Sequence, residues 1–307
     1  MPDPKPRNLL KNMKVLARTR TPYNDILVTQ FGLLLEMWFL GEGQFFLQSR
    51  VDVEDPRSLQ LVYSRMILAA LLFRPRPRRV LIIGLGGGAV SNWLHAGFPQ
   101  AEIDVVEIDP QVIRFARKYF FVQEAPGYRI HQQDGRVFVA EQLKRGVAYD
   151  IIFLDAFKSG SIPYHLKTAE FYQNLRAVLS AEGVAASNLY GKSNKLKPRD
   201  RETFLSIFPQ VYLFEDTDKV ATVSIATQQQ VRWTHDQFRR QGAAFPSPPG
   251  MSLPMESVAA SLQEPQRHAQ GGRVFRDDFP AGKFAGAVER HNLQRGASPP
   301  YPISNVS

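Results

Sequence analysis

The segment VLIIGLGGGAV, residues 80–90, decides the fold, because it joins an apolar strand to a glycine-rich turn and then to a predicted helix. Gly84, Gly86 and Gly88 occupy alternate positions of that turn. Glycine allows a tight turn and a close approach of the backbone to a ligand. The third glycine of a GxGxxG dinucleotide fingerprint is missing, and GxGxG is the pattern expected where an adenosine carrying a sulfonium meets the loop. The alternative is a turn that only lets helix and sheet pack closely.

The order of strand, turn and helix recurs along the chain. Apolar strands are predicted at 103–109, 128–134, 149–157 and 183–191, with helices between them at 111–120, 137–146 and 168–180. Apolar strands that alternate with amphipathic helices form a parallel sheet covered on both faces. Residues 211–215 and 220–228 are expected to add an antiparallel hairpin. The sequence therefore predicts an α/β fold with a doubly wound sheet.

The regions on either side of this core have a different pattern. The predicted units are a basic extension (1–22), a β-hairpin unit (23–54), the core (55–228), and a helix with a Pro/Gly-rich tail (229–307). Asp55 and Pro56 are typical of a helix start, and apolar residues at helical spacing predict a buried helix up to Phe73. One helix is expected at 235–241, and about the last 40 residues are expected to be loosely held apart from 274–279.

The composition excludes several classes of protein. The chain has 307 residues and no cysteine, which excludes disulfide frameworks and cysteine-ligated metals and fits a cytoplasmic location. No apolar run reaches the roughly 18 residues that span a bilayer, so no membrane partner is expected. His95, His131 and His165 are too dispersed to predict a metal site.

The net charge is the next compositional feature. Lys and Arg number 38 against 29 Asp and Glu, a formal net charge of +9. The sequence shows no zinc-finger spacing and no RNA-binding aromatic motif. We therefore interpret the excess as a solvated basic face and do not expect nucleic acid as a partner.

Acidic residues follow the strands of the predicted sheet. Glu107, Asp109, Asp134 and Asp155 each lie at or just after the end of a predicted strand. The carboxyl ends of neighbouring parallel strands face one crevice, so these acids are expected to converge there. Glu107 would hold a ribose, Asp134 an adenine amino group, and Asp155 would act as a general base or stabilise a cation. The alternative for each acid is a helix N-cap, which we favour for Asp109 because Pro110 follows it.

Taken in order, the motifs between Tyr23 and Gly191 resemble the spermidine synthase family of polyamine aminopropyltransferases, and most closely its bacterial spermidine synthase-like branch. They are FFLQSR (45–50), DPRSLQLVYSRM (55–66), IIGLGGGAV (82–90), VVEIDP (105–110), QDGR (133–136), YDIIFLDAF (149–157) and IPYHL (162–166). VFRDDFP (274–280) resembles a terminal acidic strand-edge motif of that branch. The resemblance implies a Rossmann-like core of the class I methyltransferase type after a β-hairpin unit, a homodimer, and decarboxylated S-adenosylmethionine as co-substrate without a tightly bound cofactor.

Together the residues and the resemblance give a set of candidate site positions. The positions expected to bind the nucleoside donor are Gln48, Gly84, Gly86, Gly88, Glu107, Asp134 and Gly135. Asp155 falls on the family's proton acceptor. The positions expected to meet the amine acceptor are Tyr63, Lys158 and Pro163.

The acceptor half of this pattern is altered. Gly87 and Lys158 stand where the family carries acids. Ser64 replaces a histidine, and Pro163 is displaced by one position. A site that desolvates two ammonium groups needs carboxylates to compensate them. We therefore expect a transferase that moves an aminopropyl group to an amine other than putrescine, unless the Lys158 side chain points into solvent.

Two other functions stay open at this point. A methyltransferase on the same scaffold would use intact S-adenosylmethionine, whose carboxylate Lys158 or Arg136 could bind. A nucleoside-binding protein without turnover would need only the donor half of the site. The sequence alone does not separate these readings, because the core is common to them.

Overall fold

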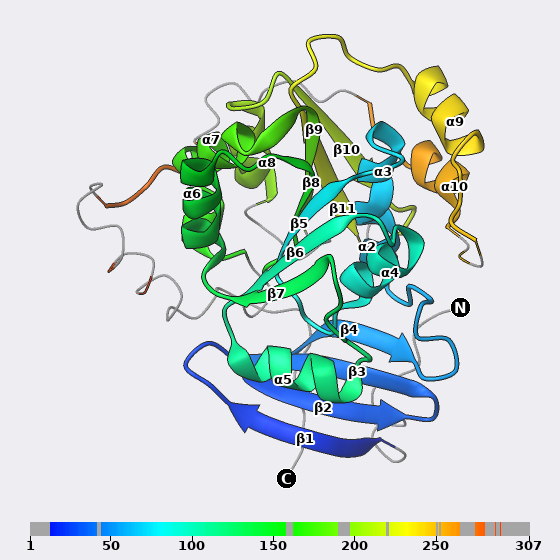
Figure 1. The fold of residues 1–307 in the computed structure, drawn as a ribbon, viewed down its shortest axis with the longest axis vertical. Helices are drawn as coiled ribbons and strands as arrows, with labels where there is room; N and C mark the ends of the chain where they lie inside the picture. The colour runs from blue at the N-terminus through cyan, green and yellow to red at the C-terminus, as the bar shows by residue number, and fades with distance from the viewer. Residues whose placement is uncertain are drawn as a thin grey trace.

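The computed structural model describes residues 13–41, 44–157, 162–189, 197–218, 221–249, 251, 253–264 and 274–279, together with residues 286 and 289. Within this part of the chain, a four-stranded antiparallel sheet lies beside a larger α/β unit with a seven-stranded sheet (Figure 1). One cluster of buried apolar side chains extends through both, from Ile26 and Met37 to Val90. None of the described helices is long and apolar enough to cross a bilayer.

The N-terminal sheet is a simple antiparallel meander. Its strands are β1 (Lys14–Arg20), β2 (Asp25–Phe31), β3 (Leu34–Gly41) and β4 (Gln44–Asp52), paired in chain order. The predicted boundary at residue 23 left β1 in the basic extension, and the structure corrects it. The edge strand β1 has no fully buried side chain, so its sequence lacks the apolar alternation that marks β2. Lysine and arginine are common on exposed edges, where they oppose aggregation.

A buried helical segment connects the two sheets. It consists of α2 (Val62–Met66), a 3-10 turn η2 (Ile67–Ala69) and α3 (Ala70–Phe73). The predicted end near Phe73 is confirmed, but the predicted start at Asp55 is wrong. The backbone N–H of Ser58 bonds to the Asp55 carbonyl at 3.0 Å, so Asp55 and Pro56 open a turn instead of a helix.

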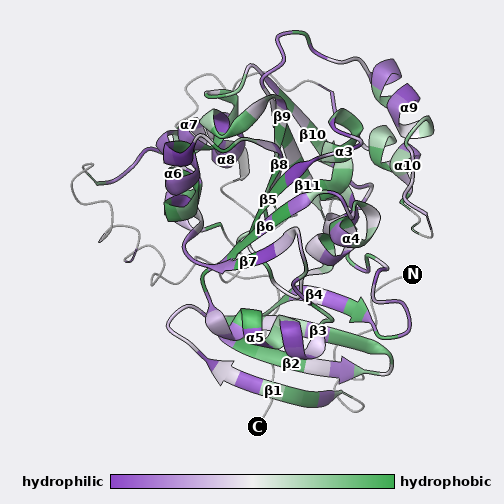
Figure 2. Ribbon diagram, viewed as in Figure 1, coloured by the Kyte–Doolittle hydropathy of each residue, from purple (hydrophilic) through white to green (hydrophobic). Residues whose placement is uncertain are grey.

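The large sheet confirms the predicted α/β class. Its spatial order is β10-β11-β9-β8-β5-β6-β7, in which β5 to β9 are parallel and β10 and β11 form an antiparallel hairpin. The strands are β5 (Arg79–Ile83), β6 (Glu102–Glu107), β7 (Tyr128–Gln132), β8 (Tyr149–Leu154), β9 (Leu179–Asn188), β10 (Gln210–Glu215) and β11 (Thr222–Thr227). The central strands are largely hydrophobic (Figure 2), as expected for a sheet buried on both faces.

Helices cover both faces of this sheet. They are α4 (Ala89–Gly97), α5 (Pro110–Tyr119), α6 (Gly135–Arg145), the turn η3 (Tyr164–Leu166), α7 (Ala169–Ala177), α8 (Lys197–Leu205), α9 (His235–Ala243) and α10 (Met255–Ala260). Side chains of α4, α5, α9 and α10 belong to one buried cluster, and those of α6, α7 and α8 to a second. The helix predicted at 235–241 is confirmed as α9, whereas α8 and α10 were not predicted.

The C-terminal segment 274–279, hereafter the strap, adopts neither helix nor strand. Its Phe275 carbonyl accepts a hydrogen bond from the N–H of Ala169, and the Phe275 N–H donates to the Thr203 hydroxyl at 3.0 Å. The strap therefore packs on α7 and α8. The resemblance of VFRDDFP to a strand-edge motif predicted a position along a strand, and the described strap pairs with none. Of the last 40 residues, which were expected to be loosely held, only the strap and residues 286 and 289 are described.

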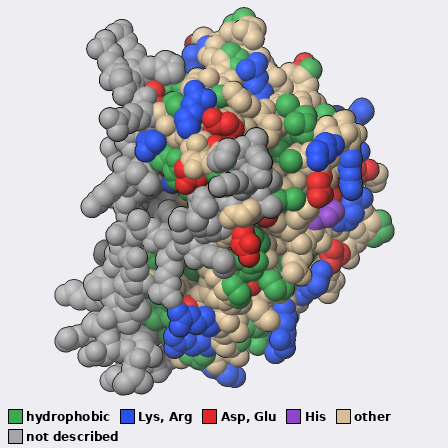
Figure 3. Space-filling model, turned by 90° about the vertical axis from the view of Figure 1, so that its left-hand side faces the viewer, with side chains coloured by type: hydrophobic (Ala, Val, Ile, Leu, Met, Phe, Trp, Pro, Cys, Tyr) green, Lys and Arg blue, Asp and Glu red, His purple; other side chains and the backbone are tan. Residues whose placement is uncertain are grey.

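On the face shown in Figure 3, Lys and Arg side chains are scattered among acidic and uncharged ones. A nucleic-acid groove would need basic side chains gathered along one track. The interpretation of the net charge as a solvated basic face stays a prediction.

Candidate active site

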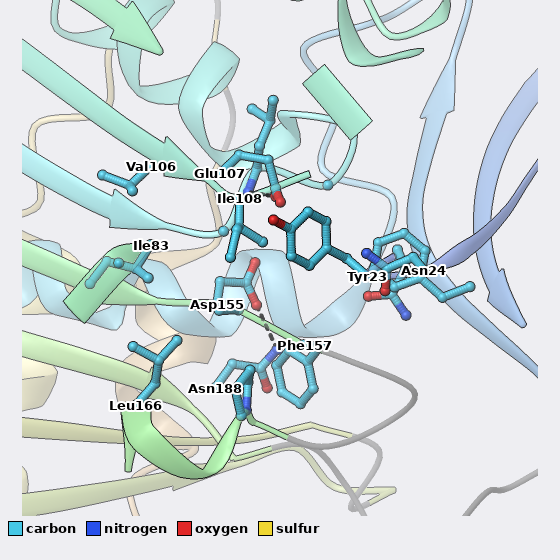
Figure 4. Close-up of a pocket in the computed structure, with 18 of the residues that line it drawn as sticks. Tyr23, Asn24, Ile83, Val106, Glu107, Ile108, Asp155, Phe157, Leu166 and Asn188 are labelled. Atoms are coloured by element: carbon cyan, nitrogen blue, oxygen red, sulfur yellow. Dashed lines mark hydrogen bonds between the residues drawn. The ribbon is translucent and has the colours of Figure 1, made fainter. Parts of the chain in front are cut away.

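A pocket opens where the carboxyl ends of the central strands meet the N-terminal sheet (Figure 4). Its described lining comes from the ends of β5, β6, β8 and β9, from the loop after β7, and from β3, β4 and residues 23–24. The charged residues in that lining are all acidic, namely Glu107, Asp134 and Asp155. Three of the four acids expected to converge are thus found together, all but Asp109, and the pocket favours a cationic ligand.

The glycine turn lies against this pocket. Gly84 and Gly86 line it, and both have positive φ, +101° and +52°. A Cβ at Gly84 would lie 2.5 Å from the Asp155 backbone oxygen, so only glycine fits there. Gly88 is not part of the described lining. It starts α4 in the left-handed conformation, and a Cβ there would meet Val122 Cγ2 at 2.4 Å, which fits the packing alternative for this glycine.

Glu107 ends β6 and is held by the backbone on two sides. Its Oε2 accepts from the N–H of Leu85 at 3.0 Å, and its Oε1 accepts from the N–H of Asp109 at 2.9 Å. Burial raises the pKa of Glu107 to about 7, and these backbone hydrogen bonds oppose the rise. Since each carboxylate oxygen has two lone pairs, the fixed carboxylate can still accept hydroxyl groups of a sugar.

Asp155 follows β8 and lies on the same side of the pocket as Glu107 (Figure 4). Its Oδ1 accepts from the amide of Asn188 at 2.9 Å, and the Tyr63 side chain also hydrogen-bonds to it. Burial raises the pKa of Asp155 to about 7, while both hydrogen bonds oppose the rise. A carboxyl group with a pKa near neutrality is well suited to exchange a proton with a bound ligand. Burial also raises the pKa of Tyr63 well above its usual value.

Asp134 and Asp109 both cap helices. The Oδ1 of Asp134 accepts from the N–H groups of Arg136 and Val137 at the start of α6. Asp109 accepts from Gln111 at the start of α5, as its N-cap interpretation required, and does not line the described pocket. Asp134 differs because it also lines the pocket. Capping and ligand binding are therefore compatible at Asp134.

The remaining donor candidates also reach the pocket. Gln48 on β4 and Gly135 at the start of α6 are part of its lining. The Gln48 carbonyl accepts from the Tyr63 hydroxyl at 3.0 Å, which ties β4 to α2. A Cβ at Gly135 would meet Ile83 Cγ2 at 2.4 Å, so glycine lets α6 start close to β5.

The acceptor candidates divide into two groups. Tyr63 and Pro163 line the pocket. Lys158 lies outside the described residues. Arg136, considered as a partner for a ligand carboxylate, is not part of the described lining, is 4% exposed and pairs with Asp277 at 2.6 Å. That expectation for Arg136 is corrected by the structure.

Two of the altered positions, Gly87 and Ser64, are described and do not line the pocket. The N–H of Gly87 donates to the Ser49 hydroxyl at 2.7 Å. A Cβ at Gly87 would lie 2.8 Å from both Phe120 Cδ1 and Ser49 Cβ. Ser64 is buried and donates its hydroxyl to the carbonyl of Leu61. Neither Gly87 nor Ser64 belongs to the described lining.

Sequence reasoning missed several residues of the pocket. Tyr23 and Asn24 enter it from the turn before β2, and Phe157 follows β8 (Figure 4). Asn188 could have been found, because it ends β9 and the strand-end rule applies to amides as well as acids. No periodicity marks Tyr23, which reaches the site only because two sheets meet there.

Comparisons with known proteins give four findings. The Spermine/spermidine synthase domain matches residues 60–214. A polyamine aminopropyltransferase of Vibrio vulnificus (strain CMCP6) is 41% identical over 203 residues, covering 66% of this chain and 67% of that protein. An eEF1A lysine and N-terminal methyltransferase of Xenopus laevis is 30% identical over 172 residues, covering 52% of this chain and 25% of that protein. A probable spermidine synthase from Corynebacterium glutamicum ATCC 13032 has a TM-score of 0.65 at 16% identity, over 86% of this chain and 97% of that one.

Proposed function

This chain belongs to the spermine/spermidine synthase family, and we propose that it transfers an aminopropyl group from decarboxylated S-adenosylmethionine to an amine acceptor. The resemblance found in the sequence is thereby confirmed. The observation that carries the proposal is a pocket in which the glycine turn, Glu107 and Asp155 lie together. The charged residues in its described lining are all acidic. A sulfonium and an amine are both cations, and such a pocket stabilises both.

The donor half of the pocket is suited to an adenosyl group. Glu107 would accept hydrogen bonds from the two ribose hydroxyls. Asp134, beside Gly135, would accept one from the adenine amino group. Gly84 and Gly86 let the backbone come close to the sulfonium side of the ligand. Each of these groups is fixed by backbone contacts before a ligand arrives, which reduces the entropy that binding costs.

The charge of the pocket favours the decarboxylated donor. Intact S-adenosylmethionine carries a carboxylate, which needs a cation or an amide donor when it is desolvated. The described lining contains no Lys or Arg, and Arg136 is engaged by Asp277 behind the pocket. The decarboxylated donor removes this anionic group and leaves an ammonium, which suits the acidic pocket.

In the proposed reaction the acceptor nitrogen attacks the propyl carbon next to the sulfonium. A carbon–nitrogen bond forms, the carbon–sulfur bond breaks, and 5′-methylthioadenosine leaves with the electron pair. Asp155 takes the proton that the acceptor nitrogen loses, and Asn188 orients its carboxylate. Because the sulfonium is already a good leaving group, alignment of nitrogen, carbon and sulfur supplies much of the rate.

We propose further that the acceptor is not putrescine. Position 87 carries no acid and does not line the described pocket. The segment 156–163, AFKSGSIP, contains Lys158 and no acid at any position. A second ammonium on the acceptor would thus lack the carboxylates that family members provide, and its desolvation would oppose binding.

The experiment is a calorimetric titration with decarboxylated and with intact S-adenosylmethionine, followed by a transfer assay over a panel of amines. We expect tight binding of the decarboxylated form and transfer to an amine other than putrescine. Preference for the intact form with methyl transfer would refute the proposal and favour the methyltransferase reading, which the match to the Xenopus protein keeps open. Binding of 5′-methylthioadenosine without transfer from either donor would indicate a nucleoside-binding protein.

A homodimer and a cytoplasmic location are also part of this proposal. The homodimer follows from the assembly that is usual in the family. Analytical ultracentrifugation at micromolar concentration tests it, and a monomer in that experiment would contradict it.

A further inference from the structure

Asp134 is held from behind by a histidine that the proposed reaction does not use. The Nε2 of His165 lies 2.8 Å from Asp134 Oδ2, and His165 is fully buried. An ionised carboxylate only accepts hydrogen bonds, so Nε2 is the donor. Oδ1 of Asp134 meanwhile takes the N–H groups at the start of α6. Both oxygens of the carboxylate are therefore fixed in direction.

His165 is in turn anchored by the strap. Its backbone oxygen accepts from Arg136 Nη1 at 3.1 Å, and Arg136 makes two hydrogen bonds to Asp277, of 2.7 and 2.6 Å. The strap also accepts a hydrogen bond from the Tyr164 hydroxyl at the Arg276 carbonyl, at 2.8 Å. Two neighbouring residues of η3 are thus bound to the strap: Tyr164 directly, and His165 through Arg136.

The pair of Arg136 and Asp277 is more than a surface contact. The Arg136 side chain is 4% exposed and that of Asp277 is 16% exposed. Removing one partner of a buried ion pair leaves the other charge without compensation. Arg136 would then have to find another counter-charge, and its bond to the His165 carbonyl would change with it.

The direction of the Asp134 oxygens matters for recognition of the base. Oδ2 accepts a bond from His165, and a carboxylate oxygen can accept more than one hydrogen bond. An adenine amino group can donate to such an oxygen, whereas the carbonyl of hypoxanthine at the same place can only accept and would face a carboxylate. Sites built around such a hydrogen bond reject analogues that lack the donor.

On the basis of the proposed function, we infer that His165 is a positioning residue that sets Asp134 to select adenine over hypoxanthine, and that Arg136 and Asp277 of the strap hold His165 in place. Base selectivity thereby depends on Asp277, which lies 141 positions from Arg136 in sequence.

The test compares two probes, 5′-methylthioadenosine and 5′-methylthioinosine, by calorimetry. Wild-type protein should prefer the adenosine compound, and His165→Leu should reduce that preference by about tenfold. His165→Gln keeps an N–H donor of similar reach and should restore most of it. If His165 had a purely structural role, His165→Leu would weaken the binding of both compounds equally. The ratio of their affinities would then be unchanged. An unchanged ratio in His165→Leu overturns the inference, whereas a wild type that binds neither compound refutes the proposed function instead.

The strap is tested by Asp277→Asn, with Arg276→Ala as the matched control in the same segment. Arg276 is exposed and its ion pair with Glu170 is longer, at 3.4 Å. Asp277→Asn should reduce the preference for the adenosine compound several-fold, Asp277→Glu should recover part of it, and Arg276→Ala should leave it unchanged. Melting temperatures of all variants show that they fold. A folded Asp277→Asn variant with wild-type preference would overturn the role of the strap.

Discussion

Asn188→Leu should move the pH profile of transfer toward alkaline pH. The Asn188 amide donates to Asp155 Oδ1 at 2.9 Å and thereby stabilises the ionised carboxylate. A hydrogen bond to a charged group is worth about 1.5–3 kcal/mol, and about 1.4 kcal/mol corresponds to one pKa unit, so its loss should raise the pKa of Asp155 by roughly one to two units. The starting value is about 7, because burial has already raised the pKa of Asp155.

The sign of the effect follows from the role of Asp155 as proton acceptor. Only the ionised carboxylate accepts a proton, so kcat/KM should rise with pH and level off above the pKa of Asp155. At pH 7 the Asn188→Leu variant should be slower by about tenfold, and near pH 9 it should approach the wild type. The assay is the pH dependence of kcat/KM between pH 5 and 10 at saturating donor.

Ser187→Ala provides the control for this experiment. Ser187 precedes Asn188 on β9 and is also fully buried, but neighbouring strand residues point to opposite faces of the sheet. The control should keep the wild-type midpoint. If Asn188→Leu keeps the wild-type midpoint as well, Asp155 does not control the reaction through its ionised form, and the proposed base must be another group.

Three further expectations follow from the site. Asp155→Asn should lower turnover by about 10²- to 10⁴-fold, as measured by release of 5′-methylthioadenosine, with little change in its affinity; unchanged turnover would remove Asp155 from the base role. Burial raises the pKa of Glu107 from 4.5 to about 7, so the folded state binds this proton more tightly than the unfolded chain and stability should fall as pH rises between about 5 and 7. Glu107→Gln should flatten that fall in melting temperature, and an equally steep fall would contradict the assignment. Gly84→Ala should destabilise the fold by about 1–3 kcal/mol in urea unfolding, because its φ is +101° and the new Cβ would lie 2.5 Å from a backbone oxygen; a neutral result would mean that the turn relaxes easily.

The sequence predicted the parts of the site that follow from strand order alone. Glu107, Asp134 and Asp155 were placed together because parallel strands of one sheet end at one edge, and this holds whatever the side chains around them do. The same reasoning would have found Asn188 at the end of β9. Buried strands also carry a strong apolar signal, so the order of the core could be predicted.

The parts that depend on contacts between distant segments could not be predicted. The partners of Asp134 are His165 and, behind it, Arg136 and Asp277, and no local pattern connects the strap to α6. The edge strand β1 buries no side chain fully and therefore resembles a basic tail in composition. Such features arise from tertiary packing, which a single sequence does not encode in its local periodicity.

The packing around Gly87 leaves little room for a side chain at that position. Without a side chain at position 87, the Ser49 hydroxyl accepts the Gly87 N–H and the Phe120 ring lies where a Cβ would point. An acid introduced at 87 would therefore meet Ser49 and Phe120 at 2.8 Å before it reached the pocket. In a close-packed interior such a clash is relieved only by moving the neighbours. If the acceptor side differs as proposed, placing an acid at position 87 would therefore require Ser49 and Phe120 to change with it.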